Sequence, residues 1–197
     1  SGNRYFSGHD DGCHFSNCKG QIVVDSCAFE GLMDDPINVH GTAVKIIERR
    51  SDHTLLCRFM HPQSTGMEWA QLGDNVGMIN HLNMQTVAYG TVVAFHPLDT
   101  RDFLIDFDKP VPEGIIAGDA LENISWTPDV TIRHCFFGSN RARGLLVSTP
   151  GKVRIEDNIF ESSGSAILIP GDANGWYESG AVKDVLIRHN KFLDPCL

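Results

Sequence analysis

The chain has 197 residues, enough for one large domain or for one domain with an insert. Its formal net charge of −9 argues against nucleic acid or an anionic membrane as a partner, because both attract net positive charge. No apolar run reaches about 18 residues, so no membrane-spanning segment is expected. The chain starts without Met and runs directly into patterned sequence, which indicates an excised fragment.

Internal repetition is the strongest signal in the sequence. Four segments read apolar, polar, polar, Asn or Cys, any residue, Phe, and they are residues 24–29, 132–137, 155–160 and 187–192. Their spacing matches the coils of a solenoid in which short strands stack on one another. The sequence therefore predicts an all-β fold, a right-handed parallel β-helix. An ordinary β-sandwich with chance similarity is the alternative.

The fourth position of each repeat alternates between Asn and Cys. Asn158 and Asn190 are expected to form an inward ladder at the bend, because an Asn amide can bond the backbone of the adjacent turn. Cys27 and Cys135 occupy the same position, which favours buried free thiols over disulfides there.

The stretch between the first and second repeats has a different texture. Short strand-like runs alternate with turn residues from about residue 42 to residue 119, which suggests a small antiparallel β-barrel inserted in one loop. The predicted domains are therefore β-helix coils over 1–41, the inserted barrel over 42–119, and further coils over 120–197.

Superposing the coils brings three carboxylates together. Alignment of residues 13–15 with residues 37–39 places Asp11 on Asp35, with Asp34 beside them. Adjacent strands lie about 4.8 Å apart, so the three side chains are expected to be neighbours across coils. Clustered carboxylates cannot all ionise freely, and a raised pKa on one gives an acid beside a base. These three aspartates are the predicted catalytic residues.

Other polar side chains are expected to line the same groove and to bind sugar. Strand alternation predicts that His14, Asn38 and His40 face solvent on this surface. The next coil places Arg141 and Arg143 at the equivalent turn, where guanidinium groups would hold the remaining charge and contact sugar hydroxyls. A charge-balanced surface ladder or a calcium site is the alternative.

The long loop 171–180 explains the widest repeat spacing and supplies further candidates for substrate binding. These are Asp172, Asn174, Trp176 and Glu178. The Trp176 ring would form a stacking platform for a sugar, and the alternative is that Trp176 only anchors its own loop.

The family resemblance is carried by residues 11–20, 33–41, 140–152, 169–174 and 178–188, together with Trp176. They resemble glycoside hydrolase family 110, the bacterial α-1,3-galactosidases. The resemblance implies a parallel β-helix with an inserted barrel. It also implies exo-acting removal of terminal α-1,3-linked galactose, as in blood group B antigens or linear galactose caps, by an inverting mechanism without a cofactor or metal.

The resemblance also bears on residue roles and location. The family's acids map onto Asp34, Asp35 and Asp11, with the acid and the base among them left open. A secreted, periplasmic or cell-surface bacterial location and a carbohydrate partner are implied, and a homo-oligomer is left open. The alternative functions are a pectinase-type β-helix hydrolase or lyase and a non-catalytic carbohydrate-binding β-solenoid.

Overall fold

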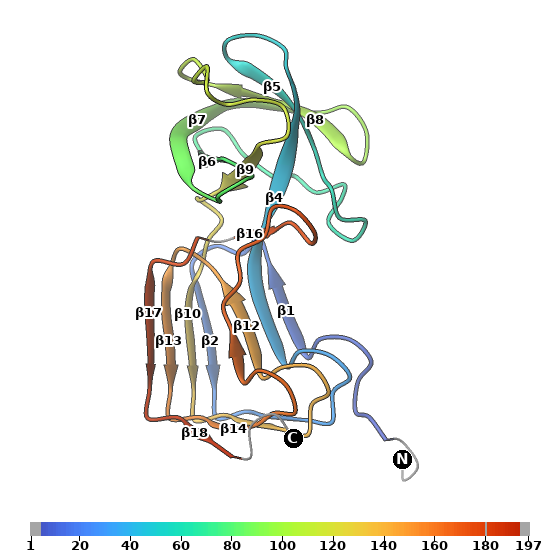
Figure 1. Cartoon of the computed structure of the whole chain (residues 1–197), viewed down its shortest axis with the longest axis vertical. Helices are drawn as coiled ribbons and strands as arrows, with labels where there is room; N and C mark the ends of the chain where they lie inside the picture. The colour runs from blue at the N-terminus through green and yellow to red at the C-terminus, as the bar shows by residue number, and fades with distance from the viewer. Residues whose placement is uncertain (1–4, 180, 194–197) are drawn as a thin grey trace. The chain divides into compact units, whose positions relative to one another are not determined.

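The computed structural model describes residues 5–179 and 181–193, and within them the chain is all β (Figure 1). The chain divides into two compact units. The parallel unit comprises Ser1–His40, Thr127–Pro170 and Ala181–Leu197, and the barrel unit comprises Gly41–Trp126 and Gly171–Gly180. A search of the described residues finds no helix long and apolar enough to span a membrane.

The parallel unit is built from short strands that pair side by side in the same direction. One stack contains β2 (Gln21–Asp25), β10 (Asp129–Arg133), β13 (Lys152–Glu156) and β17 (Asp184–Arg188). A second contains β3 (Ala28–Glu30), β11 (Phe136–Gly138), β14 (Ile159–Glu161) and β18 (Lys191–Phe192). A third contains β1 (Cys13–Ser16), the start of β4 (Ile37–Arg49), β12 (Leu145–Ser148) and β15 (Ile167–Leu168).

A sharp bend joins the first stack to the second in every repeat. The bend residues lie in the left-handed region, with φ of 57° at Ser26, 53° at His134, 56° at Asp157 and 55° at His189. None of them is glycine, so each bend costs about 1–2 kcal/mol that surrounding contacts must offset.

Asn158 supplies such contacts directly after one bend. Its side chain accepts a hydrogen bond from the Cys135 backbone N–H at 2.9 Å and donates one to the Ile132 carbonyl at 2.9 Å. It also donates to the side-chain oxygen of Asn190 at 3.0 Å, and Asn190 in turn donates to the Ile155 carbonyl at 2.8 Å. The inward Asn ladder expected from the repeat is therefore confirmed.

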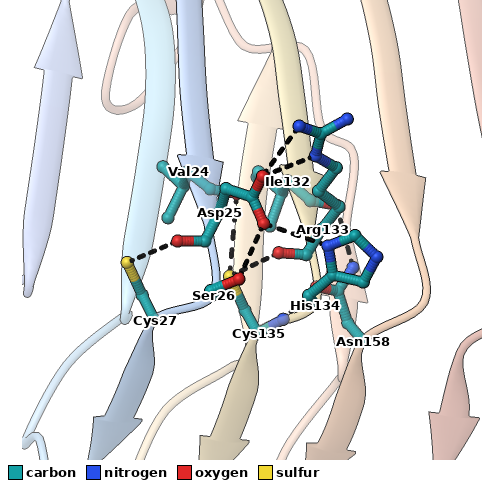
Figure 2. A network of polar contacts seen from close by, with 9 residues as sticks. All are labelled: Val24, Asp25, Ser26, Cys27, Ile132, Arg133, His134, Cys135 and Asn158. Atoms are coloured by element: carbon teal, nitrogen blue, oxygen red, sulfur yellow. Dashed lines mark hydrogen bonds and ion pairs between the residues drawn. The ribbon is translucent and has the colours of Figure 1, made fainter.

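A surface network flanks the bends at Ser26 and His134 (Figure 2). The Asp25 carboxylate accepts hydrogen bonds from His134 at 3.0 Å and from the Arg133 Nε at 2.8 Å. Hydrogen bonds from His134 and then from Arg133 lower the pKa of Asp25 to about 2. Cys27 and Cys135, drawn beside this network, are both free thiols, but only Cys135 is buried, so the expectation of burial is wrong for Cys27.

The repeat phenylalanines form a column behind the bends. Phe29 stacks on Phe137 with ring centroids 5.3 Å apart, Phe137 on Phe160 at 4.9 Å, and Phe160 on Phe192 at 5.3 Å. The rings are within 10° of parallel. The strand registers pair the same residues, so the alignment read from the repeat is confirmed residue by residue.

The barrel unit closes on itself. Its strands run in the order β4, β5 (Thr54–Arg58), β8 (Asp102–Phe107), β7 (Thr86–Pro97), β6 (Asn75–Ile79) and β9 (Ala120–Asn123), and β9 pairs again with β4. All six pairings are antiparallel. Large side chains such as Trp69, Phe103 and Phe107 fill the interior, and the short strand β16 (Glu178–Ser179) pairs with β4.

The fold class expected from the sequence, a right-handed parallel β-helix with an inserted barrel, is wrong as an assignment for the chain. The closed element among the described residues is the six-stranded antiparallel barrel. The third parallel stack is not self-contained, because β4 continues without a break from parallel pairing into the barrel sheet. A repeat of short apolar strands indicates which strands are neighbours, but it does not determine how the whole chain closes.

We expect Asn158→Ala to lower the free energy of unfolding by about 2–4 kcal/mol, because it leaves a buried N–H and a buried carbonyl without partners. Chemical denaturation measures the change. Lys152→Ala, on exposed β13 surface, is the control and should change stability by less than about 0.5 kcal/mol. Equal effects of the two variants would contradict a structural role of the ladder.

Candidate active site

Parallel pairing of β1 with β4 assembles the candidate site within the parallel unit. Cys13 pairs with Ile37, which brings the turn before β1 beside the turn before β4. Three carboxylate oxygens, one from each of Asp11, Asp34 and Asp35, lie within 4.8 Å of one another. Such a set of hard oxygen ligands also suits a divalent cation, so the expectation that the site holds no metal stays a prediction.

Asp35 is the most enclosed member of the cluster. Its residue is 1% exposed, and its carboxylate forms a two-pronged ion pair with Arg143, at 2.8 Å from Nε and 2.6 Å from Nη2. A planar guanidinium matches both carboxylate oxygens at once, which fixes geometry as well as charge. Asp35 is therefore held in place and kept next to a permanent positive charge.

The other two carboxylates are shifted in opposite directions. Burial raises the pKa of Asp34 above its ordinary value, and the negative charges of Asp11 and Asp35 raise it further. Burial also raises the pKa of Asp11, but hydrogen bonds and the charge of His14, with further hydrogen bonds from the Asp35 backbone and Asn38, bring it below its ordinary value. One carboxyl thus holds its proton more strongly than its neighbour does.

Two histidines extend the cluster along the strands. His14 Nδ1 lies 2.8 Å from an Asp11 oxygen, and His14 Nε2 lies 2.7 Å from His40 Nε2. Asn38 and His40 are only 4% and 3% exposed, so the expectation that strand alternation leaves them facing solvent is wrong for both. The His14 side chain is 46% exposed and does face solvent.

The next turn contributes the two arginines in different ways. Arg143 binds Asp35, whereas Arg141 donates from Nε to the Met33 carbonyl at 2.6 Å. The structure also identifies Asn140, which sequence reasoning passed over. Its buried amide accepts from the Leu32 N–H at 2.9 Å and donates to the Phe29 carbonyl at 3.1 Å, which holds the segment leading to the aspartates. Its position next to Arg141 in the sequence is the signal that could have identified Asn140.

The loop 171–180 belongs to the barrel unit, and its residues are organised around Asp172. The Asp172 carboxylate accepts backbone hydrogen bonds from Asn174 at 2.6 Å, from Gly175, from Trp176 and from Tyr177 at 3.0 Å. Burial raises the pKa of Asp172, but these backbone hydrogen bonds bring it below its ordinary value. Asp172 is therefore the residue that shapes the loop.

The remaining loop candidates differ in exposure. Trp176 is 61% exposed and its ring lies against His61, with centroids 4.6 Å apart and planes tilted by 33°. Asn174 is exposed, and Glu178 is partly buried in β16, where it pairs with Thr42 of β4. A stacking platform for sugar at Trp176 therefore stays a prediction.

The chain is similar to one described protein family and to several curated bacterial enzymes. Residues 54–121 match the protein family described as GLAA-B beta-barrel domain II. An Alpha-1,3-galactosidase B of Bacteroides thetaiotaomicron is 56% identical over 193 residues, which is 98% of this chain and 31% of that protein. An Alpha-1,3-galactosidase B and an Alpha-1,3-galactosidase A of Bacteroides fragilis are each 45% identical, over 97% of this chain and 34% and 32% of their own lengths.

The barrel is thus of the GLAA-B type, and it accompanies a carboxylate cluster carried by stacked parallel strands. The chain belongs to the family of the bacterial α-1,3-galactosidases, glycoside hydrolase family 110. It spans about a third of the length of the curated relatives that it matches.

We expect Arg143→Met to destabilise the protein by about 2–4 kcal/mol, because it leaves the buried Asp35 carboxylate without its cation. This loss of stability is smaller than that expected for a fully buried ion pair, because the Arg143 side chain is 34% exposed. Adding Asp35→Asn should recover much of the loss, as measured by chemical denaturation in a double-mutant cycle. Strictly additive losses would contradict a direct coupling.

Proposed function

We propose that this chain carries the catalytic carboxylates of an exo-acting glycoside hydrolase that releases terminal α-1,3-linked galactose. The observation that carries the proposal is the cluster of Asp11, Asp34 and Asp35, whose members differ in their hold on a proton. The relatives are named α-1,3-galactosidases A and B, which supports galactose as the sugar released.

In the proposed mechanism Asp34 is the general acid and Asp11 the general base. The acid must be protonated to donate to the leaving oxygen, and the raised pKa of Asp34 favours that state. The base must be ionised to activate water, and the lowered pKa of Asp11 favours that state. Asp35, bound to Arg143, would keep the pair in place and maintain the negative field that raises the pKa of Asp34.

The proposed stereochemistry is inversion, and it sets a geometric demand. Inverting enzymes separate their two carboxyl groups by about 6.5–9.5 Å to leave room for water. The nearest oxygens of the cluster lie within 4.8 Å of one another. Inversion by this pair therefore requires the carboxyl groups of Asp34 and Asp11 to move apart when substrate binds.

Sugar binding completes the proposal. His14 is the member of the cluster's histidine pair with an exposed side chain, and Trp176 offers an exposed ring for stacking on an apolar sugar face. Asn38, Arg141, Arg143, Asp172, Asn174 and Glu178 stay predicted contributors to the substrate site. A secreted, periplasmic or cell-surface location stays a prediction that follows from the family resemblance.

The first test measures galactose release from α-1,3-galactobiose and from the branched blood group B trisaccharide. We expect Asp34→Asn and Asp11→Asn each to lower kcat by about 10²–10⁴-fold, because each removes one proton-transfer group. Asp10→Asn, an exposed neighbour in the same turn, is the matched control and should keep the parent activity.

The outcomes separate the alternatives. Proton NMR of the first product should show β-galactose if the anomeric centre is inverted, and α-galactose would contradict inversion. Unchanged release by both variants would exclude the proposed catalytic residues. Turnover of polygalacturonate instead of galactosides would favour a pectinase-type enzyme, and binding without turnover would favour a carbohydrate-binding module.

The second test is the pH dependence of kcat/KM. Activity requires ionised Asp11 and protonated Asp34, so we expect a bell-shaped profile. The acid limb should lie below the ordinary aspartate pKa, because the pKa of Asp11 is lowered, and the alkaline limb should lie above it, because that of Asp34 is raised. Residual activity of Asp34→Asn should lose the alkaline limb, and its persistence would contradict the assignment of the acid.

A further inference from the structure

A chain of hydrogen bonds runs from the proposed base into the protein. Asp11 Oδ2 lies 2.8 Å from His14 Nδ1, and His14 Nε2 lies 2.7 Å from His40 Nε2. The two rings meet edge to face, with centroids 4.9 Å apart and planes at 75°. This arrangement places a second, almost fully buried histidine behind the one that contacts the carboxylate.

The chemistry of the two contacts determines where the protons lie. An ionised carboxylate only accepts hydrogen bonds, so His14 must carry its proton on Nδ1 where it faces Asp11. A hydrogen bond between two ring nitrogens contains a single proton. In the neutral pair, His14 Nε2 is then the acceptor and His40 Nε2 the donor.

We propose that His40 is a positioning residue for the base Asp11, acting through His14. By donating to His14 Nε2, it reinforces the tautomer that Asp11 also favours, and it holds the ring so that the Nδ1 proton of His14 points at the carboxylate. The same logic operates wherever a buried group sets the tautomer of a working histidine. The inference rests on the proposed function of Asp11 and adds to it a role for His40 that is not sugar binding.

The location of His40 suits a positioning role. His40 is 3% exposed, whereas the His14 side chain is 46% exposed, so the two histidines differ in access to a ligand. Strand pairing fixes the His40 backbone on both sides, opposite Ser16 of β1 and opposite Ser148 of β12. A residue held between two paired strands has little freedom to follow a substrate.

The orientation of the Asp11 carboxylate is restrained because both of its oxygens accept hydrogen bonds. Oδ2 accepts from His14, and Oδ1 accepts from the Asp35 N–H at 3.2 Å. Asn38 donates a further hydrogen bond to the carboxylate. Together these hydrogen bonds hold the carboxylate plane and direct the lone pair that remains for a proton from water, and losing the one from His14 would loosen that orientation.

The test compares two substitutions at residue 40 in the complete protein. His40→Gln keeps an N–H donor at nearly the reach of Nε2, whereas His40→Met has similar bulk without a donor. We expect His40→Met to lower kcat by about 10–100-fold, the range typical of outer hydrogen-bond partners, with KM nearly unchanged. His40→Gln should restore most of kcat, and thermal unfolding should show both variants folded.

A spectroscopic readout tests the hydrogen bond without catalysis. Ring ¹⁵N shifts of the ¹⁵N-histidine-labelled protein, with His14 assigned from the spectrum of His14→Gln, should show His14 protonated on Nδ1. In His40→Met the population of that tautomer should fall, because only Asp11 then favours it. A His14 ring protonated on Nε2 alone in the parent protein would overturn the inference.

The two proposals fail in different variants. If Asp11→Asn loses activity while His40→Met keeps the parent kcat, the positioning role is wrong and the proposed function stands. If Asp11→Asn keeps full galactose release, the proposed function is wrong, and the positioning role that depends on it is overturned as well. A fall in kcat that His40→Gln fails to reverse would assign His40 to packing and would also overturn the inference.

Discussion

The in-register pairing of short parallel strands is the constraint on which the candidate site depends. Asp11 and Asp35 are 24 positions apart, and they meet only because Cys13 pairs with Ile37. A slip of one residue would turn every side chain of β1 to the other face. The Asn ladder and the phenylalanine column hold the same kind of register in the later repeats, between β3 and β18.

Three aspartates close together repel one another, which opposes folding. The structure offsets this repulsion by giving each aspartate a different set of neighbouring groups. Arg143 compensates Asp35, the most buried of the three. Hydrogen bonds from His14, Asn38 and the backbone compensate Asp11. Asp34 keeps the least favourable balance, and protonation relieves it. The burial and the repulsion that cost stability at Asp34 therefore raise its pKa, while hydrogen bonds lower that of Asp11, and together they create the difference that acid–base chemistry needs.

The sequence predicted which short strands pair with one another, but it did not predict how the fold closes. Phe29, Phe137, Phe160 and Phe192 recur with the same neighbours because stacked strands need matching side chains at each level, so the alignment predicts register. Whether such strands form a solenoid that stands alone depends on where strands such as β4 continue, and residue pattern does not encode that. The expected boundaries at residues 41 and 119 stay a prediction.

Within the site, the sequence predicted proximity better than it predicted roles. Period-two alternation identified the face shared by Asn38 and His40, yet burial depends on what else covers that face, so the expected exposure was wrong. Asp172 is of a residue type that can bind sugar hydroxyls, but its carboxylate oxygens accept hydrogen bonds from the backbone of its own loop. Only the conformation of the loop reveals these hydrogen bonds. A side chain's role follows from which of its polar atoms are already engaged. That is why the contact between His14 and His40 assigns a positioning role to a histidine that the sequence had assigned to sugar binding.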